Sequence, residues 1–310
     1  MAGLSRRAFL ATGAALAACR PADPVSAEAA AAAAGGTVVV EGVPIRLRRM
    51  GRGRPLCLIH GASGNLNDMT FRLAPALAER FEVIVVDRPG HGLSGTPAGG
   101  GTSIRRQAAL LRGALAALGI ARPVVVGHSY GGAVALAWAV DAPQDLSALV
   151  LLAAPSQVWE GGLGLGTDLM ASPLTGPLLT RAIPHLVTRD HAERTVAGVF
   201  APQAPPEGYL AHLDLALVLR PATLRENARQ LVALKEELRP MVPAYSGLAM
   251  PVGLAHGDAD RTVGLDIHTR PLARQVPGAR LTILPGIGHM LHQVATDACV
   301  AVIADTAGRA

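Results

Sequence analysis

The sequence has few aromatic residues and almost no lysine. It contains four Phe, three Tyr and two Trp among 310 residues, and Lys235 is its single lysine. Proteins that bind single-stranded nucleic acid stack bases on aromatic rings along a basic groove. Here the arginines are scattered in ones and twos and form no stripe. We therefore interpret the net charge of +5 as a general surface property and predict no nucleic-acid partner.

Cysteine is also scarce, with residues only at positions 19, 57 and 299. Cys57 and Cys299 lie in apolar runs, which favours buried free thiols over a disulfide. No group of Cys, His and acidic residues has the spacing of metal ligands. The sequence therefore predicts neither a metal site nor another cofactor, and it indicates no particular oligomeric state.

The N-terminus lacks an apolar run long enough to span a membrane, since residues 11–18 are only weakly apolar. Residues 5–10, which read Ser-Arg-Arg-Ala-Phe-Leu, resemble a bacterial twin-arginine export signal. Leu-Ala-Ala-Cys at 16–19 resembles a lipobox, which predicts lipidation of Cys19 and a membrane anchor outside the cytoplasm. The alternative is cleavage near Ala27 and release of a periplasmic protein. We predict a signal at 1–19 and an Ala-rich linker at 20–36.

The rest of the chain predicts a three-layer α/β fold. Residues 83–86 are apolar without alternation, which is typical of a strand covered on both faces of a parallel sheet. Helical stretches at 69–80, 103–118, 130–140 and 266–275 alternate with strands. We expect eight strands in one mostly parallel sheet, at residues 37–41, 44–48, 55–60, 81–87, 123–127, 148–153, 251–256 and 280–284.

The alternation stops between residues 157 and 245, where prolines recur between helical stretches. We interpret this segment as a helical cap, inserted between a first part of the core at 37–156 and a second part at 246–310. Because strands of one sheet flank it, the cap is expected above the carboxyl ends of those strands.

A Gly-x-Ser-x-Gly motif follows the predicted strand at 123–127 and precedes a helix. In that context the motif predicts a nucleophile elbow, with Ser129 as the nucleophile at the N-terminus of the helix. Gly127 and Gly131 are needed because a larger residue at either position would collide with neighbouring backbone. His128 is expected to pack at the elbow.

These residues and three further segments resemble the α/β-hydrolase family from residue 37 to the C-terminus. The first segment, residues 60–64, matches the family's HGxxG loop, and the second, residues 87–94, matches DxxGxGxS. The resemblance implies that the backbone N–H groups of Ala62 and Tyr130 form an oxyanion hole. It also implies supporting roles for His60 and Gly61.

The third segment supplies the base, because the family places its catalytic histidine after the last strand. That residue is His289, with His292 as the nearest rival. The family pattern GxxD after the preceding strand makes Asp260 the carboxylate that orients the histidine. Asp258 is expected to cap the turn there.

A serine at the elbow disfavours the alkyl-enzyme chemistry of dehalogenases and epoxide hydrolases. The resemblance implies a serine esterase or lipase that acts on a small-molecule apolar acyl substrate through an acyl-enzyme, with thioester or amide cleavage as variants. Cofactor-free perhydrolysis (haloperoxidase type), acyl transfer and carbon–carbon bond hydrolysis would use the same residues. A non-catalytic binding or assembly protein on the same fold is a further alternative.

Overall fold

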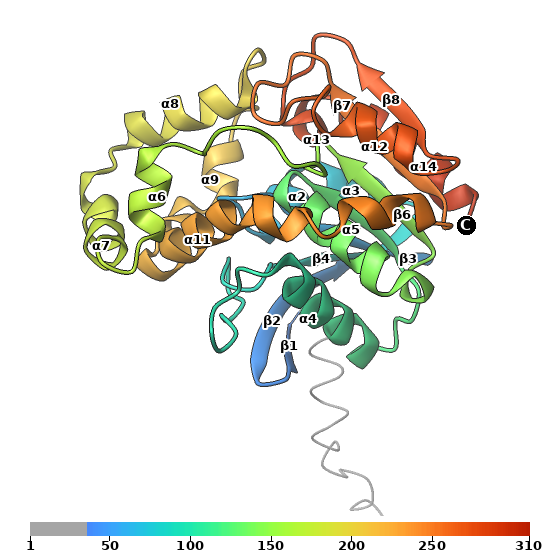
Figure 1. The fold of residues 1–310 in the computed structure, drawn as a ribbon, viewed down its shortest axis with the longest axis horizontal. Coiled ribbons are helices and arrows are strands. Elements are labelled where there is room, and N and C mark those ends of the chain that lie inside the picture. The colour runs from blue at the N-terminus through green and yellow to red at the C-terminus, as the bar shows by residue number, and fades with distance from the viewer. Residues whose placement is uncertain (1–35) are drawn as a thin grey trace, which may run out of the picture.

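The computed structural model describes residues 36–310. The predicted signal, Cys19 and the linker up to residue 35 lie outside the described residues. The sheet contains eight strands in the order β1-β2-β4-β3-β5-β6-β7-β8 (Figure 1). The strands are β1 Thr37–Val40, β2 Val43–Met50, β3 Arg54–Ile59, β4 Phe81–Val86, β5 Val124–His128, β6 Ala148–Leu152, β7 Val252–Gly257 and β8 Arg280–Leu284.

Strand β2 pairs antiparallel with both β1 and β4, and every other pair in the sheet is parallel. The predicted mostly parallel sheet of eight strands is therefore confirmed. Each predicted strand overlaps an observed one.

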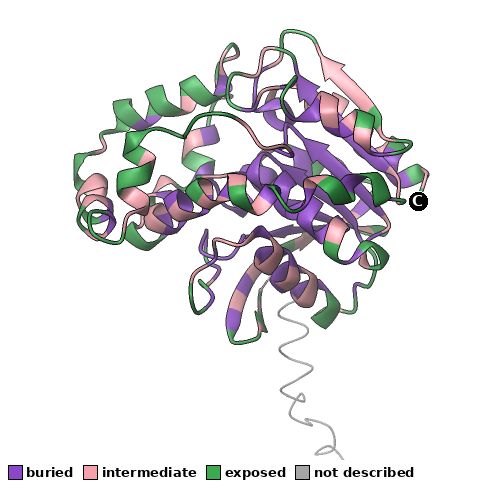
Figure 2. Cartoon of the chain, viewed as in Figure 1, coloured by how far each residue is buried: buried purple, intermediate pink, exposed green. Residues whose placement is uncertain are grey.

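The central strands are buried on both faces because helices cover each side of the sheet (Figure 2). Successive side chains of a strand point to opposite faces. Cys57 and Ile59 accordingly join the core beneath helices α4 (Ile104–Ala117) and α5 (Tyr130–Asp141). The alternate positions of β3 join a second core with α3 (Leu73–Ala78) and α14 (Thr296–Gly308). The three layers predicted from the sequence are thus present.

Two short helices replace the single helix predicted at 69–80. Helix α2 covers Leu66–Phe71 and α3 begins at Leu73. The break lies at Arg72, whose backbone is not helical. Pro75 explains it, because proline donates no backbone hydrogen bond and its ring would clash with the carbonyl of Phe71 in a continuous helix.

Helices alone fill the chain between β6 and β7, apart from the loops that join them. Helix α11 is the longest, and α6 and α7 pack against it (Figure 1). They are α6 Leu165–Ala171, α7 Gly176–Leu186, α8 Arg189–Phe200, α9 Tyr209–Leu213, α10 Leu215–Val218, α11 Pro221–Leu238 and the 3-10 helix η2 Val242–Gly247. The remaining elements are the 3-10 helix η1 Pro143–Asp145, α12 Thr269–Gln275 and α13 Leu291–Val294.

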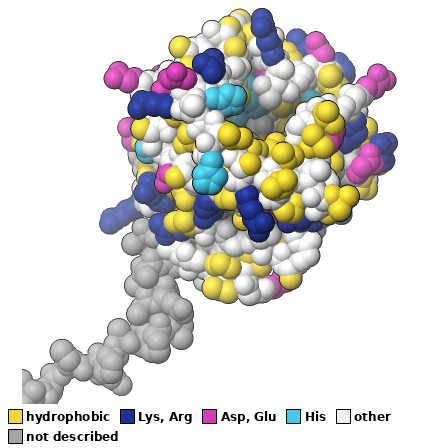
Figure 3. Space-filling model, turned by 90° about the vertical axis from the view of Figure 1, so that its left-hand side faces the viewer, with side chains coloured by type: hydrophobic (Ala, Val, Ile, Leu, Met, Phe, Trp, Pro, Cys, Tyr) yellow, Lys and Arg dark blue, Asp and Glu magenta, His cyan; other side chains and the backbone are white. Residues whose placement is uncertain are grey.

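Six leucines around α6 and α7 face outward, with exposed fractions of 38% to 89%. They are Leu163, Leu165, Leu169, Leu174, Leu178 and Leu186, which we call the cap leucines. Figure 3 views the molecule from this side, where hydrophobic side chains gather beside a hollow. Much of the cap's apolar side-chain surface is therefore exposed to solvent. Among the described residues, none of the helices combines the length and apolar character needed to cross a membrane.

Candidate active site

The turn between β5 and α5 holds Ser129 in a conformation that few non-glycine residues adopt, with φ 51° and ψ −125°. Backbone packs tightly around it. A Cβ atom at Gly127 would lie 2.3 Å from the carbonyl oxygen of Gly131, and one at Gly131 would lie 2.3 Å from that of Ile59. Both positions therefore require glycine, as the motif predicts.

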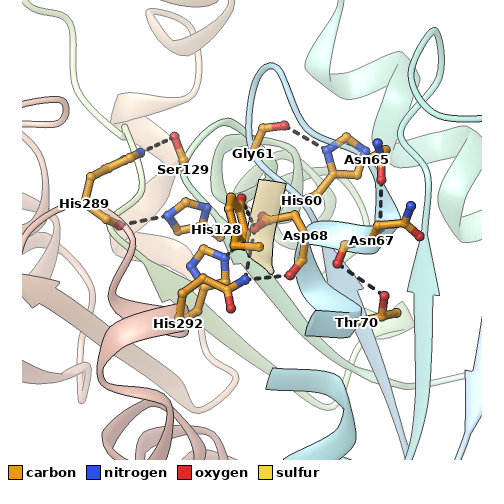
Figure 4. Close-up of polar contacts among 12 residues, drawn as sticks. His60, Gly61, Asn65, Asn67, Asp68, Thr70, His128, Ser129, His289 and His292 are labelled. Carbon is orange, nitrogen blue, oxygen red and sulfur yellow. Dashed lines mark hydrogen bonds and ion pairs between the residues drawn. The ribbon is translucent and has the colours of Figure 1, made fainter. Parts of the chain in front are cut away.

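The structure brings Ser129, Asp260 and His289 together (Figure 4 shows the serine and the histidine). The Ser129 hydroxyl lies 2.9 Å from His289 Nε2, and His289 Nδ1 lies 2.8 Å from Asp260 Oδ2. Ser129 and His289 are only 8% and 4% exposed. A Cβ at Gly257 would lie 2.0 Å from the carbonyl oxygen of Ile287, so the loops after β7 and β8 are in contact.

His289 has a defined role in this chain of hydrogen bonds. A carboxylate only accepts, so Nδ1–H donates to Asp260 and Nε2 is free to accept the Ser129 hydroxyl proton. Burial raises the pKa of Asp260, but hydrogen bonds from His256 and His289 outweigh burial and hold that pKa well below its usual range. Asp260 is therefore ionised at neutral pH.

His256 is a supporting residue that the sequence analysis did not identify. Its Nε2 lies 3.1 Å from Asp260 Oδ2 and 2.9 Å from the carbonyl oxygen of Val263, while Nδ1 lies 2.6 Å from Thr269 Oγ1. Nε2–H thus donates to the acid. Its position at the end of β7, directly before Gly257 and the loop that carries Asp260, was the sequence feature that could have identified it.

The two acids of this loop divide their roles differently from the prediction. Asp260 Oδ1 accepts the N–H groups of Thr262 and Val263, so the catalytic candidate itself caps the turn. Asp258 instead accepts the N–H of Gly286, which follows β8. Asp258 therefore links two loops.

The loop after β3 packs directly against the nucleophile, since a Cβ at Gly61 would lie 3.2 Å from Ser129 Cβ. His60 Nδ1 donates to the Gly61 carbonyl at 2.8 Å, and its Nε2 accepts the backbone N–H of Arg88. Burial, followed by the charge of Arg88, lowers the pKa of His60 to about 3, so its ring is neutral at physiological pH. Within residues 36–310, the Ala62 N–H donates to no other group.

A second buried cluster lies behind the first, where His128 Nε2 donates to the backbone carbonyl of His289 at 3.0 Å (Figure 4). His292 contacts the Asp68 carboxylate at 3.1 Å, and the Tyr209 hydroxyl donates to the same carboxylate at 2.8 Å. The rival base His292 thus contacts Asp68, whereas the histidine that contacts Ser129 is His289. Burial lowers the pKa of His128 well below its ordinary value.

This cluster contains three side chains that could act as metal ligands, a group that the sequence spacing did not indicate. Candidate ligand atoms of Asp68, His128 and His292 lie within 4.8 Å of one another. The sequence did not indicate the group because its members come from three distant segments. Asp68 already has protein partners, and His292 supplies a hydrogen bond and an opposing charge.

The comparisons with known proteins agree with this architecture. A sequence model of the family described as "alpha/beta hydrolase fold" matches residues 54–295. The magnesium-chelatase 30 kDa subunit of Rhodobacter capsulatus is 32% identical over 267 residues, which cover 82% of this chain and 86% of that protein. The chain belongs to the α/β-hydrolase fold family.

A further sequence relative and a protein of similar fold are named for different reactions. A 2-hydroxy-6-oxononadienedioate/2-hydroxy-6-oxononatrienedioate hydrolase of Paraburkholderia xenovorans is 29% identical over 231 residues, covering 74% of this chain and 76% of that protein. The enol-lactonase from Burkholderia xenovorans LB400 shares the fold with a TM-score of 0.67 at 21% identity, covering 87% of this chain and 98% of that one. Because one fold hosts several reactions, the reaction has to be argued from the site.

Proposed function

We propose that this α/β hydrolase is a serine hydrolase that cleaves the carboxylic ester of an apolar acyl substrate. The observation that carries the proposal is the unbroken chain of hydrogen bonds from Asp260 through His289 to the Ser129 hydroxyl. A serine hydroxyl is a poor nucleophile unless a base removes its proton. Here the base lies within 2.9 Å and is oriented by an ionised acid.

The reaction proceeds in two steps at Ser129. His289 Nε2 takes the hydroxyl proton while Ser129 Oγ attacks the carbonyl carbon, whose oxygen becomes an oxyanion held by the Ala62 and Tyr130 N–H groups. The carbon–oxygen bond to the alcohol then breaks, and the leaving oxygen takes the proton from His289. In the second step, water gives a proton to His289 while its oxygen attacks the acyl carbon. The bond from that carbon to Ser129 Oγ then breaks, the acid leaves, and His289 returns the proton to Ser129 Oγ.

Carbon–carbon bond hydrolysis is the second candidate, and the name of the Paraburkholderia xenovorans relative favours it. The same serine and histidine would serve, with a carbon leaving group in place of an oxygen. Thioester or amide cleavage, acyl transfer and perhydrolysis are further variants of the same site. They differ in the leaving group or in the acceptor that resolves the acyl-enzyme.

A series of p-nitrophenyl esters of increasing chain length tests ester cleavage. We expect turnover by the wild type and none above background by Ser129→Ala, which removes the nucleophile and little else. If the folded wild type hydrolyses no member of the series while a vinylogous diketone substrate is cleaved, carbon–carbon hydrolysis replaces ester hydrolysis.

The cap leucines favour a lipid ester as the natural substrate. Soluble monomers rarely expose large contiguous apolar patches, and such patches commonly mark interaction sites. Six exposed leucines on one cap segment provide a surface that can enter an ester aggregate or a bilayer. We expect long-chain esters above their critical micelle concentration to be cleaved faster than the same esters as monomers. Leu174→Ser with Leu178→Ser should abolish that difference, whereas Val39→Ser, at an exposed apolar position on β1, should leave it.

Export and lipidation at Cys19 complete the proposal, supported by the sequence of residues 5–19. A lipid anchor would hold the enzyme at a membrane surface, where lipid esters are found. Cell fractionation tests this: the wild type should sediment with membranes and Cys19→Ala should be released into the periplasmic fraction. Retention of the wild type in the cytoplasm would contradict export.

A further inference from the structure

Arg88 is a buried cation whose hydrogen-bond partners are all neutral. Its side chain has no exposed surface, yet no carboxylate of the described residues is within ion-pair distance. The guanidinium donates to the carbonyl oxygens of His60 and Gly61, each at 3.0 Å. It also donates to the side-chain oxygens of Gln107 and Gln230, at 3.0 and 2.6 Å.

Such an arrangement is costly, because a buried charge without a paired counter-charge is destabilising. Burial lowers the pKa of Arg88 to about 10, while Tyr130, Glu226 and Asp87 oppose that effect through space. The guanidinium is therefore still positively charged at neutral pH. Because no paired carboxylate neutralises this charge, it can polarise the neighbouring groups.

What lies next to it is the proposed oxyanion hole. The Gly61 carbonyl that accepts from Arg88 belongs to the same peptide group as the Ala62 N–H. Ala201–Pro202 is the only cis bond among the described residues, so the peptide between Gly61 and Ala62 is trans. In a trans peptide the carbonyl and the N–H point in opposite directions. In Figure 4 the Gly61 oxygen points toward His60, on the side away from Ser129.

We propose that Arg88 acts as a positioning residue for the oxyanion hole: by donating to the Gly61 carbonyl, it polarises that peptide and strengthens the Ala62 N–H as a donor to the oxyanion. The inference rests on the proposed function, since it assigns a task within the same site. The physical basis is that hydrogen bonds in series polarise one another, most of all in a low dielectric. A charged donor has a greater effect than a neutral one.

Two further contacts act in the same direction. His60 Nδ1–H donates to the same Gly61 oxygen at 2.8 Å, so that one carbonyl accepts two hydrogen bonds. The Arg88 guanidinium carbon lies 4.3 Å from the ring centroid of Tyr130, whose backbone supplies the other proposed oxyanion donor. The cation thus lies against the Gly61–Ala62 peptide and against the Tyr130 ring, and it makes no hydrogen bond to Ser129 or His289.

A purely structural role is the competing explanation. Gln230 belongs to α11, so Arg88 also joins the core to the cap. Loss of this contact between core and cap would lower the stability of the protein and the fraction of folded enzyme. It would not change how strongly each intact site stabilises a negative oxygen, and this difference separates the two roles.

The test uses a trifluoromethyl ketone with a carbon-13 label at its carbonyl. Ser129 Oγ adds to the carbonyl carbon, the hydroxyl proton moves to His289, and the carbonyl oxygen becomes the oxyanion of a stable hemiketal. The chemical shift of the labelled carbon, followed against pH in the full-length protein, gives the pKa of that oxygen. In Arg88→Met we expect this pKa to rise by about one unit relative to the wild type. The turnover number for p-nitrophenyl esters, per site titrated with a fluorophosphonate, should fall about tenfold with little change in KM.

Thr306→Val is the matched control. It removes a buried polar group on α14, the last helix of the chain, whereas the loop of Gly61 and Ala62 follows β3. It should leave the hemiketal pKa unchanged. If Arg88→Met does not fold, His60→Leu and His60→Asn replace it. His60→Leu removes the second donor to the Gly61 carbonyl and should raise the hemiketal pKa. In His60→Asn the side-chain amide can still donate to that carbonyl, so the hemiketal pKa should not change. An unchanged hemiketal pKa in the folded Arg88 or His60→Leu variant overturns the inference. Failure of the wild type to form the hemiketal at all would instead contradict the proposed function.

Discussion

At the scale of single residues, the two carboxylate oxygens of Asp260 have separate tasks. Oδ2 accepts from His289 and His256, while Oδ1 accepts two backbone N–H groups of its own turn. The turn therefore fixes the carboxylate, and the carboxylate fixes the tautomer of the base. This division could not be predicted from the spacing of the motif, which assigned the capping role to Asp258.

Asp260→Asn tests this arrangement, because an amide can donate to His289 and stabilise the wrong tautomer. We expect the turnover number for an ester to fall by about three to four orders of magnitude, with KM little changed. Steady-state kinetics measure both. Asp258→Asn is the matched control, and we expect its turnover to stay within about twofold of the wild type because Asp258 only joins two loops. Equal losses in the two variants would contradict the assignment of the acid.

At the scale of elements, sequence patterns located the strands well because burial on both faces leaves an uninterrupted apolar run, as in β4. The elbow was equally predictable, since its backbone packing requires glycine at positions 127 and 131, two residues before and after Ser129. Features that depend on tertiary contacts could not be predicted from the sequence. The cluster of Asp68, His128 and His292 and the carbonyl bonded by Arg88 join segments that are distant in the chain. Nor can a leucine pattern distinguish the inner from the outer face of a cap helix.

Gly131→Ala tests the packing of the elbow. The added methyl would lie 2.3 Å from the Ile59 carbonyl oxygen, so β3 and α5 must separate. We expect a loss of about 1–3 kcal/mol in the free energy of unfolding, measured by urea titration. Gly198→Ala is the control, because that helical glycine in α8 has open space around it. It should be neutral or stabilising by up to about 1 kcal/mol. A Gly131→Ala variant as stable as Gly198→Ala would show that the elbow is not tightly packed.

At the scale of the whole molecule, Asp68 connects three parts of the fold. It lies on α2 and accepts hydrogen bonds from Tyr209 at the start of α9 and from His292 on α13. The cap, the core helix α2 and the helix that follows His289 therefore meet at one carboxylate. Burial raises the pKa of Asp68, but the charge and hydrogen bond of His292 outweigh burial, so its pKa lies well below the ordinary range.

The pH dependence of stability follows from that direction. A carboxyl whose pKa is depressed by folding contributes stability above its unfolded value, about 3.9, and loses it as pH falls through the folded value. Asp68→Asn should therefore be less stable than the wild type at pH 7, and its free energy of unfolding should decline less steeply below about pH 4. Urea titrations at a series of pH values measure both effects. Asp141→Asn, which removes a partly exposed ion pair with Arg105, should match the wild type within about 1 kcal/mol. Parallel acid limbs for wild type and Asp68→Asn would contradict the depressed pKa of Asp68.

Activation of Ser129 by His289 can be measured by stoichiometric labelling with a fluorophosphonate, followed by peptide mapping. We expect one label per chain, on Ser129, with labelling abolished in Ser129→Ala and slowed by orders of magnitude in His289→Ala. Labelling of the folded wild type at another residue, or a rate that does not depend on His289, would contradict it.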